Sequence, residues 1–414
     1  MRLPTFILNL LAKLEAAGFQ AFVVGGCVRD YMLGLEPEDW DICTAARPED
    51  MLEVFHAYTV IPTGIQHGTV TVITGEGHAE VTTFRNDGVY TDSRHPQSVT
   101  FVSDITQDLA RRDFTVNAMA YTPNQGMHDP FGGKKDLQQK LLRCVGKADK
   151  RLQEDALRIL RALRFSAVYE LTIEPDTAHA MLNNQQGLIK IARERVWAEL
   201  KKTLKAKQPG KLLVNYPSIL SSLFQTNFFA DLARENPKVW ENSMKFVDLL
   251  PCRSDIRLAG LLSPLRHQPE VYEKLVYNLK PDNETKQAVL RYLHMTDSPL
   301  PSTLPAMRRM VGALGFDSVA SFLSWKEAQA VVWDKSPKEQ TKQNLANCRE
   351  NLAKIRENNL PCRIAELAID GDDCLQAGIP AGREIGLVLQ RCLNAVIDEK
   401  VPNEKKALRN LLFL

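Results

Sequence analysis

A change in sequence pattern near residue 148 constrains the fold more than any other feature. Before it, short runs rich in β-branched residues alternate with helical stretches; after it, leucines recur at helical spacing and such runs nearly vanish. The first pattern predicts an α/β arrangement with a mixed sheet, and the second predicts amphipathic helices. We therefore expect an α+β head followed by an all-helical remainder. The expected strands are AFVV (21–24), WDICT (40–44), HGTVTVIT (67–74), HAEVTTF (78–84) and VTFV (99–102).

A chain of 414 residues is too long for one hydrophobic core, so several domains are expected. At the N-terminus, Leu8, Leu11, Leu14 and Phe19 recur near helical spacing, which predicts an amphipathic helix rather than a signal peptide. Prolines interrupt the second part of the chain and predict short helices there. The expected divisions are a head (1–148), a helical neck (149–210), a helical body (211–320) and a helical tail (321–414).

Composition excludes some classes of protein. The eight cysteines form no C-x-x-C pair, which argues for reduced thiols in a cytoplasmic protein. No apolar run approaches the ~20 residues that a membrane-spanning helix needs. With a formal charge of +2, a nucleic-acid surface would have to be a local patch. The basic segment 190–211 is such a patch, although a solvated helix face explains it equally well.

Paired glycines in the head are one candidate for phosphate binding. Gly25 and Gly26 follow the first expected strand and lead into an apparent helix. Such a turn lets backbone N–H groups approach a phosphate, but a tight turn before a packed helix is an equally good explanation. The third glycine of a dinucleotide-binding fingerprint is missing, which argues against a dehydrogenase.

Carboxylates form the second candidate site. Asp39 and Asp41 flank Trp40 in an expected strand, so both carboxylates share one face and Trp40 points to the other. Two such charges repel unless cations lie between them, although D-x-D pairs are also common in surface loops. Alternation places Glu80 on one face of a later strand together with Phe84, where it can join the pair. Three carboxylates suit two hard cations that clamp a phosphoryl group.

Together these motifs resemble the polymerase-β-like nucleotidyltransferases. A longer ordered series, over roughly residues 20–210, is similar to the class II tRNA nucleotidyltransferase and bacterial poly(A) polymerase family. A weaker likeness to bacterial CCA-adding enzymes continues in residues 366–386. The series comprises GGCVRDYMLG (25–34), EDWDICTAARPE (38–49), HGTVTV (67–72), EVTTFR (80–85), RRDFTVNAMAY (111–121), DPFGGKKDL (129–137), EDALRILRALRFSA (154–167) and RERVWAEL (193–200).

The resemblance implies a polymerase-β-like head, all-α neck, body and tail domains, and metal-dependent nucleotidyl transfer. Asp39 and Asp41 would bind two Mg²⁺ ions, with Glu80 as a supporting catalytic carboxylate. One ion would activate the 3′-hydroxyl of the primer, and the other would hold the triphosphate and stabilise departing pyrophosphate. The triphosphate would lie near Gly25, Gly26 and Arg29.

The same resemblance implies nucleotide contacts in the segment 111–121. Arg111 and Arg112 suit phosphate oxygens, and Asp113 suits a ribose hydroxyl. Asn117 belongs to the same segment and is also a candidate nucleotide contact. Two surface arginines and a structural amide remain the alternatives.

Asp155 and Arg158 are implied to select the base. Three residues apart, they are expected to share a helix face. The carboxylate accepts from the exocyclic amine that cytosine and adenine carry, and the guanidinium donates to the neighbouring ring acceptors. Uracil and guanine present a carbonyl instead, which leaves the carboxylate without a donor. Glu154 and Arg161 are expected to orient the pair; a surface ion pair is the alternative interpretation.

Two features favour CCA addition to tRNA, with CTP and ATP as substrates. Segment 86–99 resembles the flexible loop of complete CCA-adding enzymes. The basic stretch and the tail would bind the tRNA acceptor arm, and phosphate contacts of this kind are salt-dependent. No membrane and no protein partner are implied. The candidate RNA-binding residues are Lys201, Lys202, Lys205 and Lys207.

Other functions remain open at this point. An A-adding enzyme that works beside a CC-adding partner, and a poly(A) polymerase, share the same head. A catalytically inactive RNA-binding protein of the same fold would not need the carboxylates Asp39, Asp41 and Glu80. A fused phosphohydrolase is disfavoured, because the only His-Asp dipeptide, His128-Asp129, precedes a Pro-Phe-Gly-Gly turn.

Overall fold

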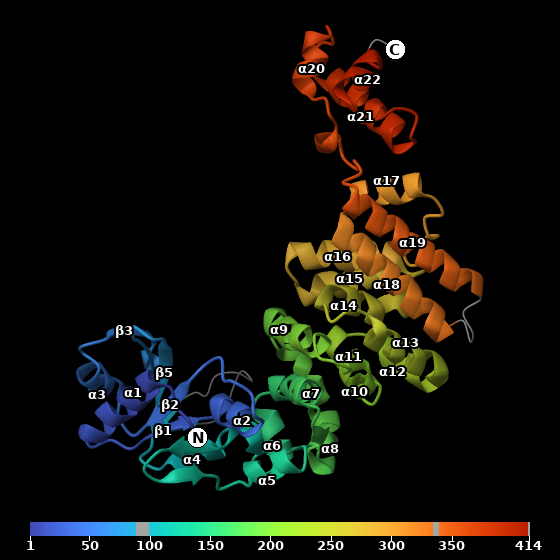
Figure 1. The fold of residues 1–414 in the computed structure, drawn as a ribbon. Helices are drawn as coiled ribbons and strands as arrows, with labels where there is room; N and C mark the ends of the chain where they lie inside the picture. Colours follow the sequence, from blue (N-terminus) through green and yellow to red (C-terminus); the bar gives the residue numbers. More distant parts are fainter. Residues whose placement is uncertain (88–98, 334–338, 413–414) are drawn as a thin grey trace. The chain divides into compact units, whose positions relative to one another are not determined.

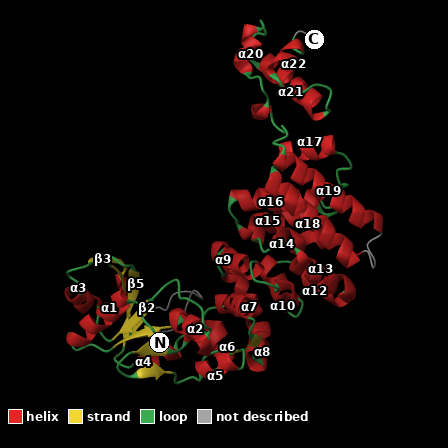
Figure 2. Ribbon diagram, viewed as in Figure 1, coloured by secondary structure: helices red, strands yellow, loops and turns green. Residues whose placement is uncertain are grey.

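The structure, a computed structural model, describes residues 1–87, 99–333 and 339–412. The chain forms two compact units, Met1–Trp240 with Tyr277–Pro281 and Glu241–Val276 with Asp282–Leu414 (Figure 1). Strands occur only in the first unit among these residues (Figure 2). Within the same ranges, no helix combines the length and apolarity that crossing a membrane requires. Of the expected flexible loop 86–99, residues 88–98 lie outside the described residues.

The first unit is built on a seven-stranded mixed sheet of order β3-β4-β5-β2-β1-β8-β9 in the described residues. Only β2 and β5 run parallel within it, and the other neighbours are antiparallel. The mixed sheet expected for the head is therefore confirmed. Its strands are β1 (Ala21–Val24), β2 (Asp41–Thr44), β3 (Thr59–Gly64), β4 (Thr69–Ile73), β5 (His78–Thr83), β8 (Ala120–Thr122) and β9 (Gly126–His128).

Short helices cover this sheet and complete the head core. The N-terminal amphipathic helix is confirmed, but Leu8 is 40% exposed, whereas Ile7, Leu10, Leu11 and Leu14 are buried. A buried cluster that includes Phe22, Phe84 and Leu109 joins strands to helix α4. The helical elements are α1 (Thr5–Ala16), α2 (Gly26–Met32), α3 (Pro48–Val54), η1 (Ile65–His67), α4 (Ile105–Ala110), η2 (Thr115–Asn117) and α5 (Gly133–Gln138), and a small hairpin pairs β6 (Arg85–Asp87) with β7 (Val99–Phe101).

Beyond residue 148 the first unit is helical, with one exception. Strand β11 (Thr172–Ile173) pairs in parallel with β10 (Leu141–Leu142), so the expectation of an all-helical remainder was wrong at this point. Helix α7 packs against α9, and α6 packs against α8. The helices are α6 (Ala148–Glu154), α7 (Leu157–Tyr169), α8 (Pro175–Asn184), η3 (Gln185–Lys190), α9 (Arg193–Leu204), α10 (Pro209–Leu213), α11 (Pro217–Phe224) and α12 (Phe228–Glu235).

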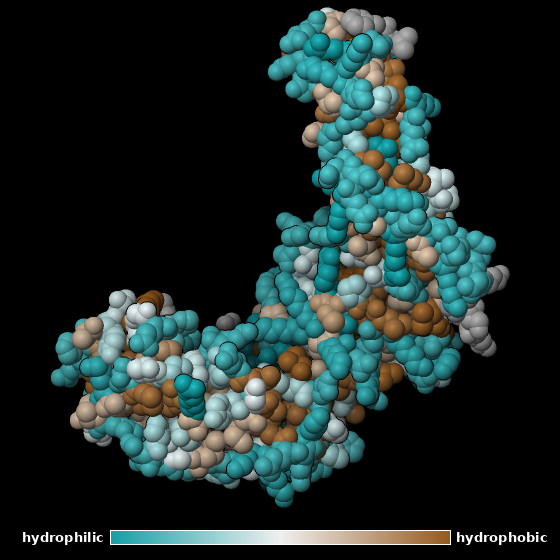
Figure 3. Space-filling model, viewed as in Figure 1, coloured by the Kyte–Doolittle hydropathy of each residue, from teal (hydrophilic) through white to brown (hydrophobic). Residues whose placement is uncertain are grey.

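The second unit holds two further buried clusters, one around Met307 and Leu323 and one around Leu389 and Val396. All eight cysteines are free thiols, as expected. Hydrophilic side chains cover most of the visible face of the molecule (Figure 3). The division into head, neck, body and tail stays a prediction. The remaining helices, of which α13 begins and α15 ends in the first unit, are α13 (Pro237–Leu249), α14 (Ser254–Leu262), η4 (Ser263–Leu265), α15 (Pro269–Leu279), α16 (Asn283–His294), α17 (Leu304–Leu314), α18 (Phe316–Trp333), α19 (Glu339–Glu357), η5 (Ile364–Glu366), α20 (Gly371–Gln376), α21 (Arg383–Ile397) and α22 (Lys405–Asn410).

Candidate active site

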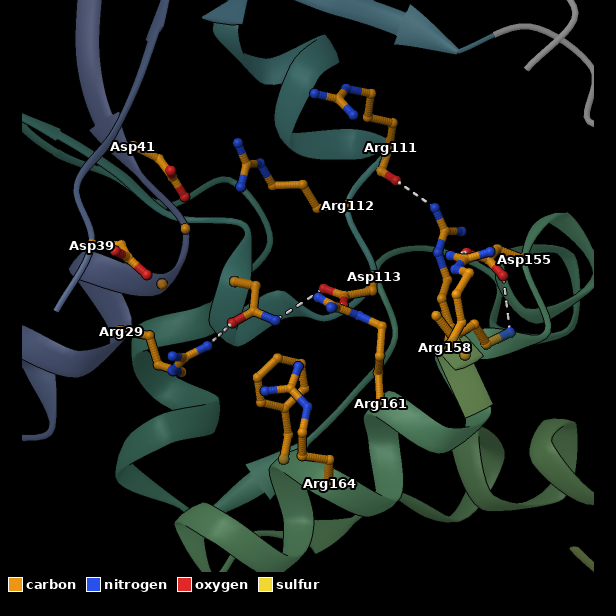
Figure 4. Close-up of a pocket in the computed structure, with 16 residues that line it drawn as sticks. Arg29, Asp39, Asp41, Arg111, Arg112, Asp113, Asp155, Arg158, Arg161 and Arg164 are labelled. Atoms are coloured by element: carbon orange, nitrogen blue, oxygen red, sulfur yellow. Dashed lines mark hydrogen bonds and ion pairs between the residues drawn. The ribbon is translucent and has the colours of Figure 1, made fainter. Parts of the chain in front are cut away.

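A cavity of about 560 Å³ in the first unit collects most of the predicted site residues (Figure 4). Seven arginines and four aspartates line it, so its net charge is positive and suits an anionic ligand. Glu80, Glu154 and the candidate lysines do not line it. The lining residues are Gly25, Gly26, Arg29, Asp39, Asp41, Arg111, Arg112, Asp113, Asn117, Asp155, Leu157, Arg158, Arg161, Arg164, Phe165 and Arg195.

The carboxylates of Asp39 and Asp41 both line the cavity, but not because they alternate along a strand. Strand β2 begins at Asp41, and Asp39 lies in the preceding bend. The prediction that both carboxylates share one face of a strand was therefore wrong, although Trp40 between them is buried and does not line the cavity. Burial raises the pKa of Asp41; Arg112 counteracts this, while Glu80 and Asp39 raise it further.

Glu80 is the register partner of Asp41 in the parallel β2–β5 pair. Its side chain is exposed, and the described residues contain no group of three or more His, Cys, Asp or Glu placed to hold a metal. Phe84 follows the end of β5 and is fully buried, so it does not share the exposed face of Glu80. The supporting role of Glu80 stays a prediction, based on this register beside Asp41.

The donor set of Asp39 and Asp41 fits magnesium. Mg²⁺ prefers oxygen ligands and retains several waters, so one or two carboxylates plus substrate phosphates are sufficient to bind it. The raised pKa of Asp41 reflects burial first and the neighbouring carboxylates second, and a cation bound beside these carboxylates would stabilise their charged form.

Gly25 forms the turn between β1 and α2. Its φ of +78° favours glycine, and a Cβ there would lie 2.6 Å from Nη1 of Arg112, so that a larger residue would also displace this guanidinium. Its N–H donates to the carbonyl of Met119 at 3.1 Å and is not directed at a ligand. Gly26, the first residue of α2, also lines the cavity. The phosphate role of this turn stays a prediction.

Arg29, Asn117 and Asp113 form a bonded chain beside the glycine turn (Figure 4). Arg29 Nη1 donates to Asn117 Oδ1 at 2.6 Å, and Asn117 Nδ2 donates to Asp113 Oδ1 at 3.0 Å. Asp113 Oδ1 also accepts from the N–H of Phe114, while Oδ2 accepts from Nε and Nη2 of Arg161. These bonds occupy its lone pairs, so the ribose contact, which stays a prediction, would require one of them to open.

A buried aspartate that sequence reasoning missed holds the arginine pair. Asp108 Oδ1 accepts from Nε and Nη2 of Arg111, at 3.0 and 2.8 Å, and Oδ2 lies 3.4 Å from Arg112 Nη2. Burial alone would raise the pKa of Asp108, but the two arginines outweigh it and lower that pKa. Arg112 extends toward Asp41 (Figure 4). The i, i+3, i+4 spacing of QDLARR was the available sequence signal.

Asp155 and Arg158 also line the cavity, for a reason other than the expected one. Asp155 has φ −143° and ψ 104°, so it lies in a break between α6 and α7 rather than on a shared helix face. Its Oδ1 accepts from the N–H of Leu157 at 2.9 Å, and its Oδ2 lies 3.3 Å from Nη2 of Arg195. The sequence assigned Arg195 only to the basic segment 190–211 and not to the nucleotide site.

Hydrogen bonds to other protein groups hold the guanidinium of Arg158 in place. Its Nη1 donates to Glu154 Oε2 and to the carbonyl of Arg151, both at 2.8 Å, and its Nη2 donates to the carbonyl of Arg111 at 3.1 Å. Glu154 therefore does contact Arg158, in line with the expected orienting role. Arg161 bonds to Asp113 instead of to the base-selecting pair.

The candidate RNA-binding lysines lie outside the cavity. Helix α9 ends at Leu204, so Lys201 and Lys202 lie in its last turn and Lys205 and Lys207 follow it. Lys202, Lys205 and Lys207 are exposed, and Lys207 lies 3.8 Å from Glu170. Lys201 is half-buried, with its Nζ 6.0 Å from the ring centroid of Trp197. Their role in binding stays a prediction.

Comparison with known proteins identifies the family. Residues 21–143 match the poly A polymerase head domain, residues 170–216 match the "Probable RNA and SrmB- binding site of polymerase A", and residues 257–412 match tRNA nucleotidyltransferase domain 2. The chain is 33% identical to CCA-adding enzymes of Leuconostoc mesenteroides and Lactiplantibacillus plantarum, over 96% of this chain and 93% of each relative. A structure of the Bacillus stearothermophilus CCA-adding enzyme in complex with CTP is 30% identical, with a TM-score of 0.74 over 100% of this chain and 98% of that chain. The chain therefore belongs to the family of CCA-adding enzymes and is a nucleotidyltransferase.

Proposed function

We propose that this enzyme adds C, C and A to the 3′ end of tRNA, using CTP and ATP and releasing pyrophosphate. One observation carries the proposal: a single cavity is lined both by the Asp39–Asp41 pair and by Asp155 with Arg158. The first pair suits phosphoryl chemistry, and the second suits the edge of a base. The relatives named CCA-adding enzymes, one of them in a complex with CTP, support this function.

The phosphoryl end of the cavity combines carboxylates with arginines. Asp39 and Asp41 would hold two Mg²⁺ ions, which when bound would activate the attacking 3′-hydroxyl and neutralise charge on the triphosphate. Arg112 extends toward Asp41 and is positioned to donate to a phosphate oxygen beside it (Figure 4). Because Asp108 anchors both Arg111 and Arg112, these guanidinium groups are ordered before a nucleotide binds.

At the base-selecting end, Arg158 and Asp155 keep donors and acceptors that a base can use. Arg158 spends both Nη1 hydrogens and one Nη2 hydrogen on protein acceptors, so among the described contacts its Nε hydrogen and one Nη2 hydrogen remain. Each Asp155 oxygen has a second lone pair that can accept from an exocyclic amine. This combination matches cytosine and adenine, and it rejects uracil and guanine by leaving Asp155 facing a carbonyl.

The exposed lysines at the end of α9 supply the proposed contact to the tRNA acceptor arm. Three of them project from a short stretch of one unit, which suits a run of backbone phosphates. Such contacts position an RNA without reading its sequence, consistent with a substrate set that comprises every tRNA.

The test uses three RNAs with the pure protein: a tRNA that lacks its last three nucleotides, a tRNA that ends in CC, and an unrelated RNA. Each receives CTP, ATP or both. The expected result is addition of C, C and A to the truncated tRNA, addition of A to the tRNA that ends in CC, and no extension of the unrelated RNA. Long A tails on any RNA would identify a poly(A) polymerase instead, and extension of only the CC-ended tRNA would identify an A-adding enzyme.

A further inference from the structure

One face of α7 is tied to the head by a closed chain of hydrogen bonds. Tyr169 and Arg161 lie eight residues apart on α7, hence on one face of the helix. Arg29 Nη2 donates to the Tyr169 hydroxyl at 2.7 Å, and Arg29 Nη1 donates to Asn117 at 2.6 Å. Asn117 bonds to Asp113, whose other oxygen accepts from Arg161 Nε at 2.7 Å. This series of hydrogen bonds therefore contacts α7 at two residues, Tyr169 and, two turns earlier, Arg161.

Arg29 is the centre of this chain and has little left for a ligand. Its Nε and Nη2 also lie 2.9 and 2.8 Å from Oδ1 of Asp30. Of the five N–H donors of a guanidinium, these contacts leave one hydrogen on Nη1 among the described partners. The guanidinium lies over the rings of Tyr169 and Phe165, with centroid distances of 4.4 and 5.0 Å, and its side chain is 7% exposed. Arg29 is therefore placed to connect helices α2 and α7 rather than to bind a phosphate freely.

The hydrogen-bond network around Arg29 connects the two helices that carry the two ends of the cavity. Helix α2 starts at the Gly25–Gly26 turn, and α7 carries Arg158 in its first turn. A bound nucleotide has to reach both, with its triphosphate at one end and its base at the other. Because Arg29, Asn117 and Asp113 at the centre of the network are buried and its members are mutually paired, the network fixes the separation of α2 and α7 more firmly than apolar packing alone.

We propose that Tyr169 is a positioning residue, which acts through Arg29 to hold α7 at the distance from α2 that aligns the base with Arg158 and Asp155. The inference rests on the proposed function, and it adds a residue for which the sequence motifs imply no role. Its consequence is that the hydroxyl of Tyr169, remote from the base itself, contributes to the choice of C over U.

The experiment compares full-length wild type with Tyr169→Phe, which removes the hydroxyl and keeps the ring. Tyr58→Phe is the matched control, because Tyr58 is a half-buried head tyrosine that does not line the cavity. Single-turnover addition of C from CTP and of U from UTP to tRNA lacking its last three nucleotides gives the base preference; steady-state kinetics give KM and kcat. A hydrogen bond to a charged group is strong enough for Tyr169→Phe to lower the CTP-over-UTP preference about tenfold.

Tyr58→Phe is expected to keep the wild-type preference. Arg29→Lys, which retains the charge but loses the planar set of N–H donors, is expected to lower the CTP-over-UTP preference as well. The double variant Arg29→Lys/Tyr169→Phe is expected to lower it no further than either single variant. A folded Tyr169→Phe enzyme with unaltered preference would overturn the inference. So would a fall in its nucleotide KM, because that result would show Arg29 released to bind the triphosphate. A wild type that adds no C to tRNA contradicts the proposed function, and the inference with it.

Discussion

Replacing Asp113 by Asn tests the buried network by its effect on stability. Burial by itself would raise the pKa of Asp113, but Arg161, Asn117 and Arg158 outweigh it and lower the pKa from 3.8 to about 2. At about 1.4 kcal/mol per pKa unit, the ionised carboxylate stabilises the fold by about 2 kcal/mol. The Arg161 side chain is 33% exposed and can turn toward water after the substitution, so the cost should stay below the ~3–5 kcal/mol of a broken, fully buried pair.

The dependence on pH has a definite sign. The pKa of Asp113 is lower in the folded than in the unfolded state, so its contribution is complete above about pH 4 and is lost as the pH falls toward about 2. The stability difference between wild type and Asp113→Asn should therefore be constant from neutral to mildly acidic pH. It should shrink below about pH 4.

Scanning calorimetry measures the effect. For a unit of this size, about 2 kcal/mol corresponds to a fall in melting temperature of about 4–8 °C in the transition of the first unit. Glu76→Gln, an exposed carboxylate in the turn between β4 and β5, is the control and should not shift that transition. An unchanged melting temperature at neutral pH, or a difference that grows on acidification, would refute the reasoning.

Three other changes test the rest of the site. Asp41→Asn should abolish nucleotide addition to tRNA while the circular dichroism spectrum stays that of wild type, and substantial residual extension would contradict a metal role. Asp108→Asn removes the negative charge and one of the two carboxylate oxygens that hold Arg111 and Arg112, so steady-state kinetics should show a nucleotide KM about tenfold higher; an unaltered KM would mean that these arginines do not bind the nucleotide. Charge reversal of the exposed lysines should weaken tRNA binding in filter assays and reduce its salt slope by roughly one per lost phosphate contact, and an unchanged slope would move the RNA surface elsewhere. The three lysines are Lys202, Lys205 and Lys207.

Part of the strand pattern of the head was readable from local sequence. Each of the five expected β-rich runs contains a strand, because residues that favour strands cluster over a few neighbouring positions. Strands β3, β8 and β9 of the same sheet were not expected. The parallel register that places Asp41 beside Glu80 could not be predicted from the local sequence. Their strands are separated in sequence by two helical elements, α3 and η1, and by two other strands, and pairing of this kind is decided by the whole sheet.

Within the site, the sequence identified residues more successfully than the geometry that unites them. Asp39 and Asp41 line one cavity because the chain bends before β2, and Asp155 lines the same cavity as Arg158 from a break between two helices. Asp108 was missed although its i, i+3, i+4 spacing to Arg111 and Arg112 was visible, because that spacing also fits an ordinary surface ion pair. Tyr169 was missed because a tyrosine near a helix end has no distinctive local pattern. Their roles come from partners on other elements.

The sequence by itself determined the mixed-sheet head, the helical remainder and the residue types that nucleotidyl transfer requires, because side-chain periodicity and motif chemistry are local. Only the tertiary structure decided which donors and acceptors are already paired within the protein. Arg29 has the motif position of a phosphate ligand, yet its hydrogens go to Asp30, Asn117 and Tyr169. A guanidinium has a fixed number of N–H groups, and the fold determines which of them remain for a substrate.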